Sequence, residues 1–244
     1  MEKSVVVITP SIGSPKLIDA INSVQEQTYK NIKHLIVIDG GDYAKQTLKL
    51  ISDNTKDKQK QIQVSCTPEN TGGPGFYGHR IYASYPHLVN SEYIFFLDED
   101  NWYDLNHVET LVDTIEKGDL DFAYSLRKIY NLEKEYMCDD NCESLGKWPI
   151  FINREHPSYL IDTSAYAFKR QFLNLHAGFW HWGWGGDRRF YNIVKDKAKH
   201  DTNGKHTLCY RLDGNEGSVT ADFFTAGNKS QFEYYQGDFP WIKR

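Results

Sequence analysis

The chain contains the run Tyr93-Ile94-Phe95-Phe96-Leu97-Asp98-Glu99-Asp100, in which apolar residues are followed at once by three acids. Such an uninterrupted apolar run is typical of a strand that is covered on both faces of a sheet. In open α/β sheets, ligands bind just beyond the carboxyl ends of these strands. Neighbouring carboxylates at that point suit Mg²⁺ or Mn²⁺, with phosphate oxygens completing the metal shell. The run therefore predicts a metal site at Asp98 and Asp100 that takes a phosphorylated, nucleotide-linked ligand.

Asp-x-Asp is a common tripeptide, so its context decides its meaning. Apolar runs at 5–9, 35–38 and 62–66 predict further strands, and apolar residues at helical spacing between them predict crossover helices. This alternation is typical of a largely parallel sheet with right-handed crossovers. Parallel pairing would bring the residues after each strand, including Asp39 and Asp98, to one edge of the sheet.

The sequence after the acids begins with a helix, for which Asp104 is the expected N-cap and Gly118 the stop. Further strands are predicted at 122–130, 159–168 and 206–212. Residues 131–157 have no clear period, so we expect a long loop close to the site.

Composition excludes several classes of protein. The 244 residues, 40% of them hydrophobic, fit one sizeable domain, and a net charge of -5 gives no general attraction to nucleic acid. No segment has the apolar length of a transmembrane helix, and the first residues lack the layout of a signal peptide. We therefore expect a cytoplasmic protein that can lie peripherally on a membrane, without a transmembrane segment or a nucleic-acid partner.

The 4 cysteines are too few and too scattered for a disulfide framework, so free thiols are expected. Cys138 and Cys142 have a spacing that occurs in zinc sites. A second convincing pair is missing from the sequence, so we do not predict a zinc site there.

These segments together resemble the inverting glycosyltransferases of family 2. The run Val6-Val7-Ile8-Thr9-Pro10-Ser11 is similar to the first strand and turn of that family, and Ser23-Val24-Gln25-Glu26-Gln27-Thr28-Tyr29-Lys30-Asn31 is similar to its Ser-Val-x-x-Gln-Thr-Tyr-x-Asn helix end. The following strand and turn, 35–41, also match, and residues 4–110 carry the clearest part of the resemblance.

The resemblance implies an α/β protein with the Rossmann-like GT-A fold, in which helices flank a mostly parallel central sheet and a C-terminal portion binds the acceptor. A single glycosyltransferase domain would span residues 1–244. Residues 1–118 would form its nucleotide-sugar-binding half, and residues 119–244 its acceptor-binding half.

Carried over by position, the resemblance also implies a set of residues that contact the nucleotide-sugar. These are Thr9, Pro10, Asp39, Asn70, Gly73, Arg80 and Asp98. Asp98 and Asp100 would hold Mn²⁺ or Mg²⁺. Family members commonly have two adjacent aspartates where this chain has Asp39-Gly40, so any role of the second acid is lost here.

The segment Trp184-Gly185-Gly186-Asp187 is similar to the Trp-Gly-Gly-Glu-Asp segment that holds the catalytic base in several such enzymes. The resemblance implies that Asp187 is the base and that Trp182, Trp184, Gly185 and Gly186 contact the acceptor. Arg188 stands where a second acid is usual. Alternatively, the segment is an aromatic core cluster in which Asp187 is a helix N-cap, and both interpretations can hold together.

The implied reaction is a metal-dependent, inverting transfer of a hexosyl or pentosyl group from a nucleotide-diphosphate sugar. A UDP-sugar is the expected donor, and the hydroxyl of a glycan, glycolipid or protein-linked acceptor receives the sugar. His206, on a late strand, is a further candidate metal ligand, although lone histidines are more often structural.

Two alternatives stay open. An aromatic content of 14% also fits a carbohydrate-binding protein without catalysis or an inactive transferase-like protein. A nucleotidyltransferase that forms sugar nucleotides would need a loop rich in glycine and basic residues after the first strand. Residues 9–16 contain one glycine and one lysine, which disfavours that class.

Overall fold

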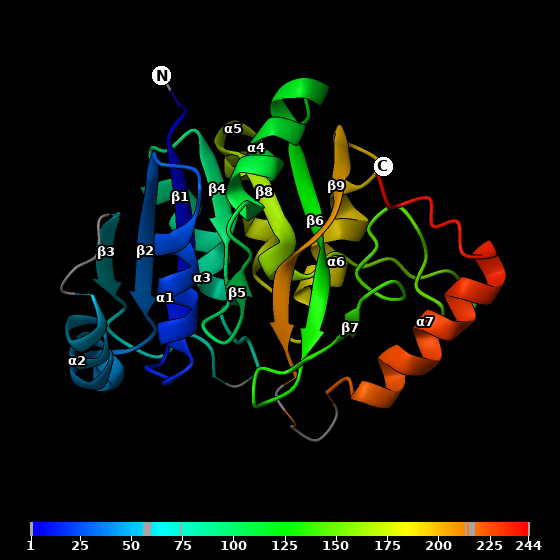
Figure 1. The fold of residues 1–244 in the computed structure, drawn as a ribbon. Coiled ribbons are helices and arrows are strands. Elements are labelled where there is room, and N and C mark those ends of the chain that lie inside the picture. The colour runs from blue at the N-terminus through cyan, green and yellow to red at the C-terminus, as the bar shows by residue number, and fades with distance from the viewer. Residues whose placement is uncertain (1, 56–59, 74, 213, 215–217, 244) are drawn as a thin grey trace.

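The computed structural model describes residues 2–55, 60–73, 75–212, 214 and 218–243. Strands in the described residues form a nine-stranded sheet in the order β3-β2-β1-β4-β8-β6-β9-β5, with β7 paired to β6 (Figure 1). The strands are β1 Val5–Ser11, β2 Ile32–Ile38, β3 Gln61–Cys66, β4 Tyr93–Phe96, β5 Trp102–Tyr103, β6 Phe122–Tyr130, β7 Tyr136–Asp139, β8 Tyr166–Lys169 and β9 His200–Arg211.

Two layers of helices cover this sheet. In Figure 1, α1 and α4 lie in front of it, and α3, α5 and α6 lie behind it. The α-helices are α1 Leu17–Glu26, α2 Ala44–Asn54, α3 His79–Ser84, α4 His107–Gly118, α5 Arg170–His176, α6 Gly186–Val194 and α7 Ala221–Tyr235, and the short 3-10 helices are η1 Gly41–Tyr43, η2 Tyr85–Leu88, η3 Thr163–Ala165 and η4 Ala177–Trp180. No helix in these described ranges combines the length and the apolar character needed to cross a bilayer.

The first half of the sheet is parallel. β1 pairs in parallel with β2 and with β4, and β2 pairs in parallel with β3. Every residue of β1 is buried, as expected for a central strand that is covered on both faces. Because these strands are parallel, the carboxyl ends of β1, β2 and β4 all reach one edge of the sheet. The expected α/β fold with a mostly parallel sheet is confirmed.

The second half of the sheet is mixed. β8 pairs antiparallel with both β4 and β6, while β6 and β9 are parallel. The strand predicted at 159–168 is wrong for most of its length. The Asp162 carboxylate accepts the N–H of Ser164 at 2.9 Å, which starts the η3 turn, and β8 begins only after it. The antiparallel direction of β8 brings this turn to the same edge as the end of β4.

Two local predictions need correction. Asp104 does not cap α4, which begins at His107, because its carboxylate instead forms an ion pair of 2.6 Å with Lys128 on β6. The stretch 131–157 is not irregular throughout, since it contains β7. Contact with β6 explains both differences. Lys128 of β6 holds the Asp104 carboxylate, and β7 forms by pairing with β6.

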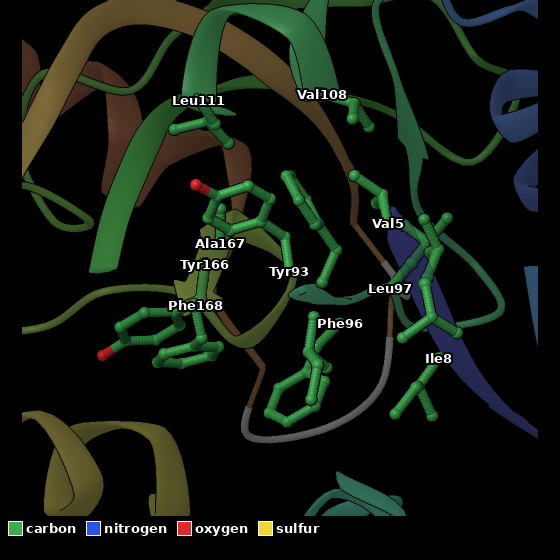
Figure 2. Close-up of a cluster of buried hydrophobic side chains, with 14 of the residues drawn as sticks. Val5, Ile8, Tyr93, Phe96, Leu97, Val108, Leu111, Tyr166, Ala167 and Phe168 are labelled. Carbon is green, nitrogen blue, oxygen red and sulfur yellow. The ribbon is translucent and has the colours of Figure 1, made fainter. Parts of the chain in front are cut away.

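The core covers both faces of β1, β4 and β8. Figure 2 shows Val108 and Leu111 of α4 at one end of this cluster and Ile8, Phe96 and Phe168 at the other, and all five are fully buried. The Phe96 ring lies 4.3 Å from the ring of Tyr82 on α3. Burying each such side chain stabilises the fold by about 1.5–3 kcal/mol. The strand ends that carry the candidate site therefore emerge from a well-packed scaffold.

Candidate active site

Three acids follow β4, and their carboxylates face three different sets of partners. Asp98 turns inward and accepts hydrogen bonds from the Tyr82 hydroxyl at 2.8 Å and from the Ser164 hydroxyl at 3.0 Å. Its own N–H donates to the same Ser164 oxygen at 3.0 Å. Asp98 thus joins the end of β4 to α3 and to the η3 turn.

Burial raises the pKa of Asp98 to about 7, and the nearby charges of Asp100 and Asp162 add to this rise. Burial also raises the pKa of Asp100, although Lys16 and Arg211 act in the opposite direction. Carboxyl groups with raised pKa values are typical of functional sites, because burying uncompensated charge costs stability.

Glu99 has a structural role in the turn after β1. Its carboxylate accepts hydrogen bonds from the Ser11 hydroxyl at 2.6 Å and from the N–H groups of Ile12 at 3.3 Å and Ser14 at 3.2 Å. These bonds fix the connection between β1 and α1 against the end of β4. Asp98 takes no part in these bonds, since Tyr82 and Ser164 donate to its carboxylate instead.

Asp39, at the end of β2, organises the loop that follows β3. Its Oδ1 accepts the N–H of Thr71 at 2.7 Å and the Thr71 hydroxyl at 2.8 Å, and its Oδ2 accepts the N–H of Gly72 at 2.9 Å. The Asn70 side chain donates to the Asp39 carbonyl at 3.0 Å and accepts the N–H of Gly73 at 2.8 Å. Asp39, Asn70 and Gly73, three of the residues predicted to bind nucleotide, therefore belong to one hydrogen-bonded unit.

Gly40 stands where members of the resembled family commonly have a second aspartate, and the structure gives a steric reason for the glycine. Its φ is +118°, a conformation that favours glycine, and an added Cβ would lie 2.9 Å from the backbone nitrogen of Asn70. An aspartate at this position would push the 70–73 loop away from Asp39. The glycine therefore allows the loop to approach the end of β2 closely.

The other residues predicted to bind the nucleotide-sugar have partners of their own. Thr9 is buried, and its hydroxyl is 2.9 Å from Nε2 of His34. Pro10 packs against Gly78 at the start of α3. The Arg80 guanidinium stacks on the Phe76 ring at 3.6 Å and donates to the Thr71 carbonyl at 3.3 Å.

Arg80 also lines a pocket of about 350 Å³ on the outer side of α3. This pocket is lined by Thr67, Thr71, Arg80, Ile81, Ala83, Ser84, Tyr85 and His181. Tyr82, by contrast, points from the same helix toward Asp98. The structure therefore groups Arg80 with the 67–76 loop, on the other side of α3 from Asp98.

Asp187 lies in the first turn of α6, directly after the Trp184-Gly185-Gly186 run. Gly185 is the N-cap of this helix, so the prediction of Asp187 as an N-cap is wrong. The Asp187 Oδ1 accepts the N–H of Arg188 at 2.7 Å. Burial and the charge of Asp162 raise the pKa of Asp187, while His79 and Arg188 lower it.

The aromatic residues beside Asp187 divide into core and surface. Trp180 is fully buried, whereas Trp182 and Trp184 are 46% and 74% exposed. The Arg189 guanidinium covers one face of Trp182 at 3.8 Å. The aromatic-core interpretation therefore holds for Trp180, and exposed indole surface remains next to Asp187.

Asp162 is a site residue that the sequence did not reveal. It interacts electrostatically with Asp98, Asp100 and Asp187, so it lies between the donor-side acids and the candidate base. Its Oδ2 is 2.8 Å from Nη1 of Arg127, which is buried and also pairs with Asp140 and Glu143. Asp162 follows an apolar pair and precedes Thr163-Ser164, an Asx-turn signal that the strand prediction at 159–168 obscured.

The carboxylates suit a divalent cation with few protein ligands. Within the described residues, no group of three or more His, Cys, Asp or Glu side chains is arranged to hold a metal. Asp98 and Asp100 carry hard oxygen atoms at the end of β4, and Mg²⁺ commonly uses one or two carboxylates together with substrate phosphates. His206 lies elsewhere on β9, with its Nδ1 3.7 Å from Asp139. The 4 cysteines are free thiols.

Comparison with known proteins gives the following results. The sequence model of the family described as Glycosyl transferase family 2 matches residues 4–174, more than half of the chain. No curated protein sequence matches the chain.

Among solved structures, the chain is similar to TarS 1-349 of S. aureus. The TM-score to its complex with UDP-GlcNAc is 0.61 at 15% identity, and the match covers 96% of this chain and 67% of that one. For its complex with UDP the TM-score is 0.59 at 16% identity, with 86% and 60% covered. A further TarS 1-349 structure gives 0.59 at 17%, so the chain spans about 60% of that structure's length. At these identities the likeness shows the fold, and it agrees with the expected GT-A type.

Proposed function

Because this chain belongs to glycosyl transferase family 2, we propose that it is a metal-dependent, inverting transferase that uses a UDP-sugar. It would move a hexosyl or pentosyl group to a hydroxyl of a glycan, glycolipid or protein-linked acceptor. Residues 1–118 would supply most donor contacts, and residues 119–244 most acceptor contacts. UDP and UDP-GlcNAc are bound in two of the similar TarS structures, which supports uridine as the nucleoside.

One observation carries this proposal. Asp98 and Asp100 after β4 and Asp187 on α6 all interact electrostatically with Asp162. Acids from three separate segments, the end of β4, the η3 turn and α6, therefore gather around Asp162. A transferase needs this arrangement, because the leaving diphosphate and the attacking hydroxyl must meet at a single carbon.

The donor would bind along the edge formed by the ends of β1, β2 and β4. Thr9, Pro10, Asp39, Asn70, Gly73, Arg80 and Asp98 form the proposed nucleotide-sugar site. Among the described residues, Oδ2 of Asp39 accepts one hydrogen bond, from Gly72, so it keeps capacity for a donor group of the nucleoside. The metal would lie at Asp98 and Asp100, and when bound it acts as a Lewis acid toward the diphosphate.

Asp187 would act as the general base. Its Oδ1 is held by the N–H of Arg188, which leaves Oδ2 for the acceptor hydroxyl. Oδ2 accepts the hydroxyl proton while that oxygen bonds to the anomeric carbon from the face opposite the diphosphate. The bond to the diphosphate oxygen breaks, its electron pair leaves with the nucleotide, and the configuration inverts. A raised pKa brings a carboxylate base nearer to the working pH, where such catalysis is most efficient.

The exposed indoles would hold the acceptor. Trp184 offers an open apolar face on which a pyranose ring can stack, with Trp182 beside it. Gly185 would let the backbone approach a sugar closely, since no heavy atom lies within 4 Å of a Cβ built there, whereas Gly186 would act through the turn that it forms against His79. The same surface also suits the alternative, a carbohydrate-binding or inactive transferase-like protein, so the experiment must separate the two.

Calorimetric titration with UDP, GDP, CDP and dTDP, each with Mn²⁺ and again with EDTA, tests the donor half. We expect UDP to bind with Mn²⁺ and to lose most of its affinity with EDTA. A panel of UDP-sugars is then assayed for release of UDP with glycan acceptors. Folded protein that binds no nucleotide would overturn the transferase proposal in favour of the carbohydrate-binding alternative.

A further inference from the structure

Two segments that are far apart in sequence are joined at one histidine. His79, the first residue of α3, has its Nδ1 2.9 Å from the Trp182 carbonyl oxygen and 3.0 Å from the Gly183 carbonyl oxygen. A carbonyl oxygen only accepts hydrogen bonds, so Nδ1 must carry the proton and donate. The tautomer of His79 is thereby fixed by the turn that precedes α6.

Packing around this hydrogen bond is tight. A Cβ added to Gly186 would lie 2.6 Å from Nδ1 of His79. The His79 ring also packs on buried Trp180, with 5.9 Å between ring centroids. Next to it, the Phe76 ring stacks on His181 at 5.6 Å. The donor-side loop and the turn at 181–186 therefore form one packed unit.

Asp187 directly follows this unit. His79 is close enough to Asp187 to interact with it electrostatically. The turn is held internally by backbone hydrogen bonds from Trp182 to Trp180 and from Gly186 to Gly183. His79 adds a connection from outside, from the helix that follows the Asp39-anchored loop. A shift of this ring would move the carbonyls of Trp182 and Gly183, and with them the start of α6.

We propose that His79 is a positioning residue whose Nδ1–H fixes the 182–186 turn and so sets the place of Asp187. Its role in catalysis rests on the proposed function, whereas its hold on the turn does not. It connects the donor-side loop to the base. Loss of the hydrogen bond should therefore lower kcat while donor binding is kept.

A pair of amide variants isolates the hydrogen bond. The Nδ2 of asparagine occupies the position of the histidine Nδ1, whereas the Nε2 of glutamine corresponds to the other ring nitrogen. His79→Asn can therefore keep the bond to the carbonyls, and His79→Gln cannot keep it in the same place. Both variants have similar polarity, so a difference between them reports the position of the N–H group.

Hydrogen exchange of the backbone gives a readout that needs no substrate. In peptides covering 181–187 we expect exchange near the wild-type rate for His79→Asn and about 10-fold faster for His79→Gln, because the turn opens locally. Peptides from α4 should be unchanged in both. Equal exchange of 181–187 in the two variants would refute the proposal.

Kinetics then tests the catalytic consequence. A displacement of about 1 Å can cost about 10²-fold in rate, so we expect kcat of His79→Gln to fall by at least about 10-fold. Its affinity for UDP with Mn²⁺ should be unchanged. In His79→Asn, kcat should return toward the wild-type value. Gly186→Ala disturbs the same contact from the other side and should lower kcat likewise. A fall in UDP affinity with normal kcat would assign His79 to the donor instead.

The two proposals fail in different ways. If the wild-type protein transfers no sugar, the proposed function is lost, and hydrogen exchange still decides whether His79 holds the turn. If the wild-type protein is active and both amide variants match it, the function stands and the positioning role is wrong.

Discussion

At the scale of single residues, the acids of the site differ in how much of their hydrogen-bonding capacity the protein itself uses. Glu99 and Asp39 are engaged mainly by backbone N–H groups and hydroxyls of neighbouring loops. Asp187 accepts one hydrogen bond from Arg188, and burial raises its pKa. A carboxylate with free capacity and a raised pKa is the better candidate for proton transfer, which is why Asp187 is assigned that role.

Replacing Asp187 with asparagine should slow sugar transfer strongly. The amide cannot accept a proton, so kcat should fall by about 10²–10⁴. UDP affinity with Mn²⁺ should be unchanged, since the proposed function gives Asp187 a role toward the acceptor and not the donor. Steady-state assays and titration measure the two quantities. Asp196→Asn, an exposed acid after α6, is the matched control, and near wild-type turnover in Asp187→Asn would require another base.

His34 predicts how stability depends on pH. Burial lowers its pKa to about 3, so the folded state keeps it neutral while the unfolded chain binds a proton below about 6.5. The unfolded state binds more protons in this range, so the free energy of unfolding should fall by about 1.4 kcal/mol per pH unit for this group as pH drops. His107 is buried with a pKa lowered in the same way and adds to the slope.

Urea denaturation between pH 4 and 7 checks this slope. His34→Gln places an amide where Nε2 contacts Thr9 and removes the titrating ring, so its stability should depend less on pH by about one proton. His87→Gln, at an exposed position, should keep the wild-type slope. Identical slopes in all three proteins would contradict the assignment.

At the scale of elements, the loop after β3 depends on the Asp39 side chain, which accepts the N–H groups of Thr71 and Gly72, 32 and 33 residues further along the chain. Glycines in this loop look like ordinary turn residues in the sequence. In the structure, a Cβ on Gly72 would lie 2.5 Å from the Tyr77 carbonyl oxygen and 3.1 Å from Oδ2 of Asp39. The loop is therefore shaped by its contacts with the end of β2.

Gly72→Ala should break this loop. The carbonyl that opposes the new methyl group is backbone and cannot move cheaply, so we expect a loss of about 1–3 kcal/mol in stability. UDP affinity should fall by about 10-fold, because the loop carries Asn70 and Gly73 of the proposed nucleotide-sugar site. Thermal unfolding and titration with UDP measure these effects. Gly178→Ala, where no heavy atom lies within 4 Å, is the control and should stay near wild type in both.

At the scale of the whole molecule, a buried ion-pair network joins the mixed half of the sheet to the site. Arg127 on β6 pairs with Asp140 at 2.7 Å, with Asp162 at 2.8 Å and with Glu143. Through Asp162 and Ser164, this network reaches Asp98 at the end of β4. The position of Asp98 therefore depends on both halves of the sheet.

Arg127→Met should destabilise the protein by about 3–5 kcal/mol. Removing the Arg127 guanidinium takes the ion-pair partner from Asp140 and Asp162 and leaves Glu143 with Arg188 at 3.8 Å, which costs more than the pairing itself contributes. The midpoint of urea denaturation measures the loss. Arg154→Met, at an exposed position, should change stability by less than about 1 kcal/mol. A loss below that value for Arg127→Met would mean that the carboxylates relax into solvent.

The sequence by itself determined the parallel half of the fold and the residues at its carboxyl edge. Apolar runs that end in Thr9, Asp39 and Asp98 require buried parallel strands, because an unbroken apolar strand must be covered on both faces. The glycine-rich loop after β3 and the run before Asp187 could also be recognised from the sequence, because their glycine and tryptophan content is a local feature.

Only the tertiary structure decided how these parts meet. Asp162, His79 and Arg127 contact the site across large separations in sequence, and no local pattern marks such contacts. In the range 159–168, where a strand was predicted, β8 begins only at Tyr166. A turn precedes it, because the Asp162 side chain accepts a hydrogen bond from the N–H of Ser164. Hydrogen bonds and charges act through space, so their partners are defined by the folded chain and not by the order of residues along it.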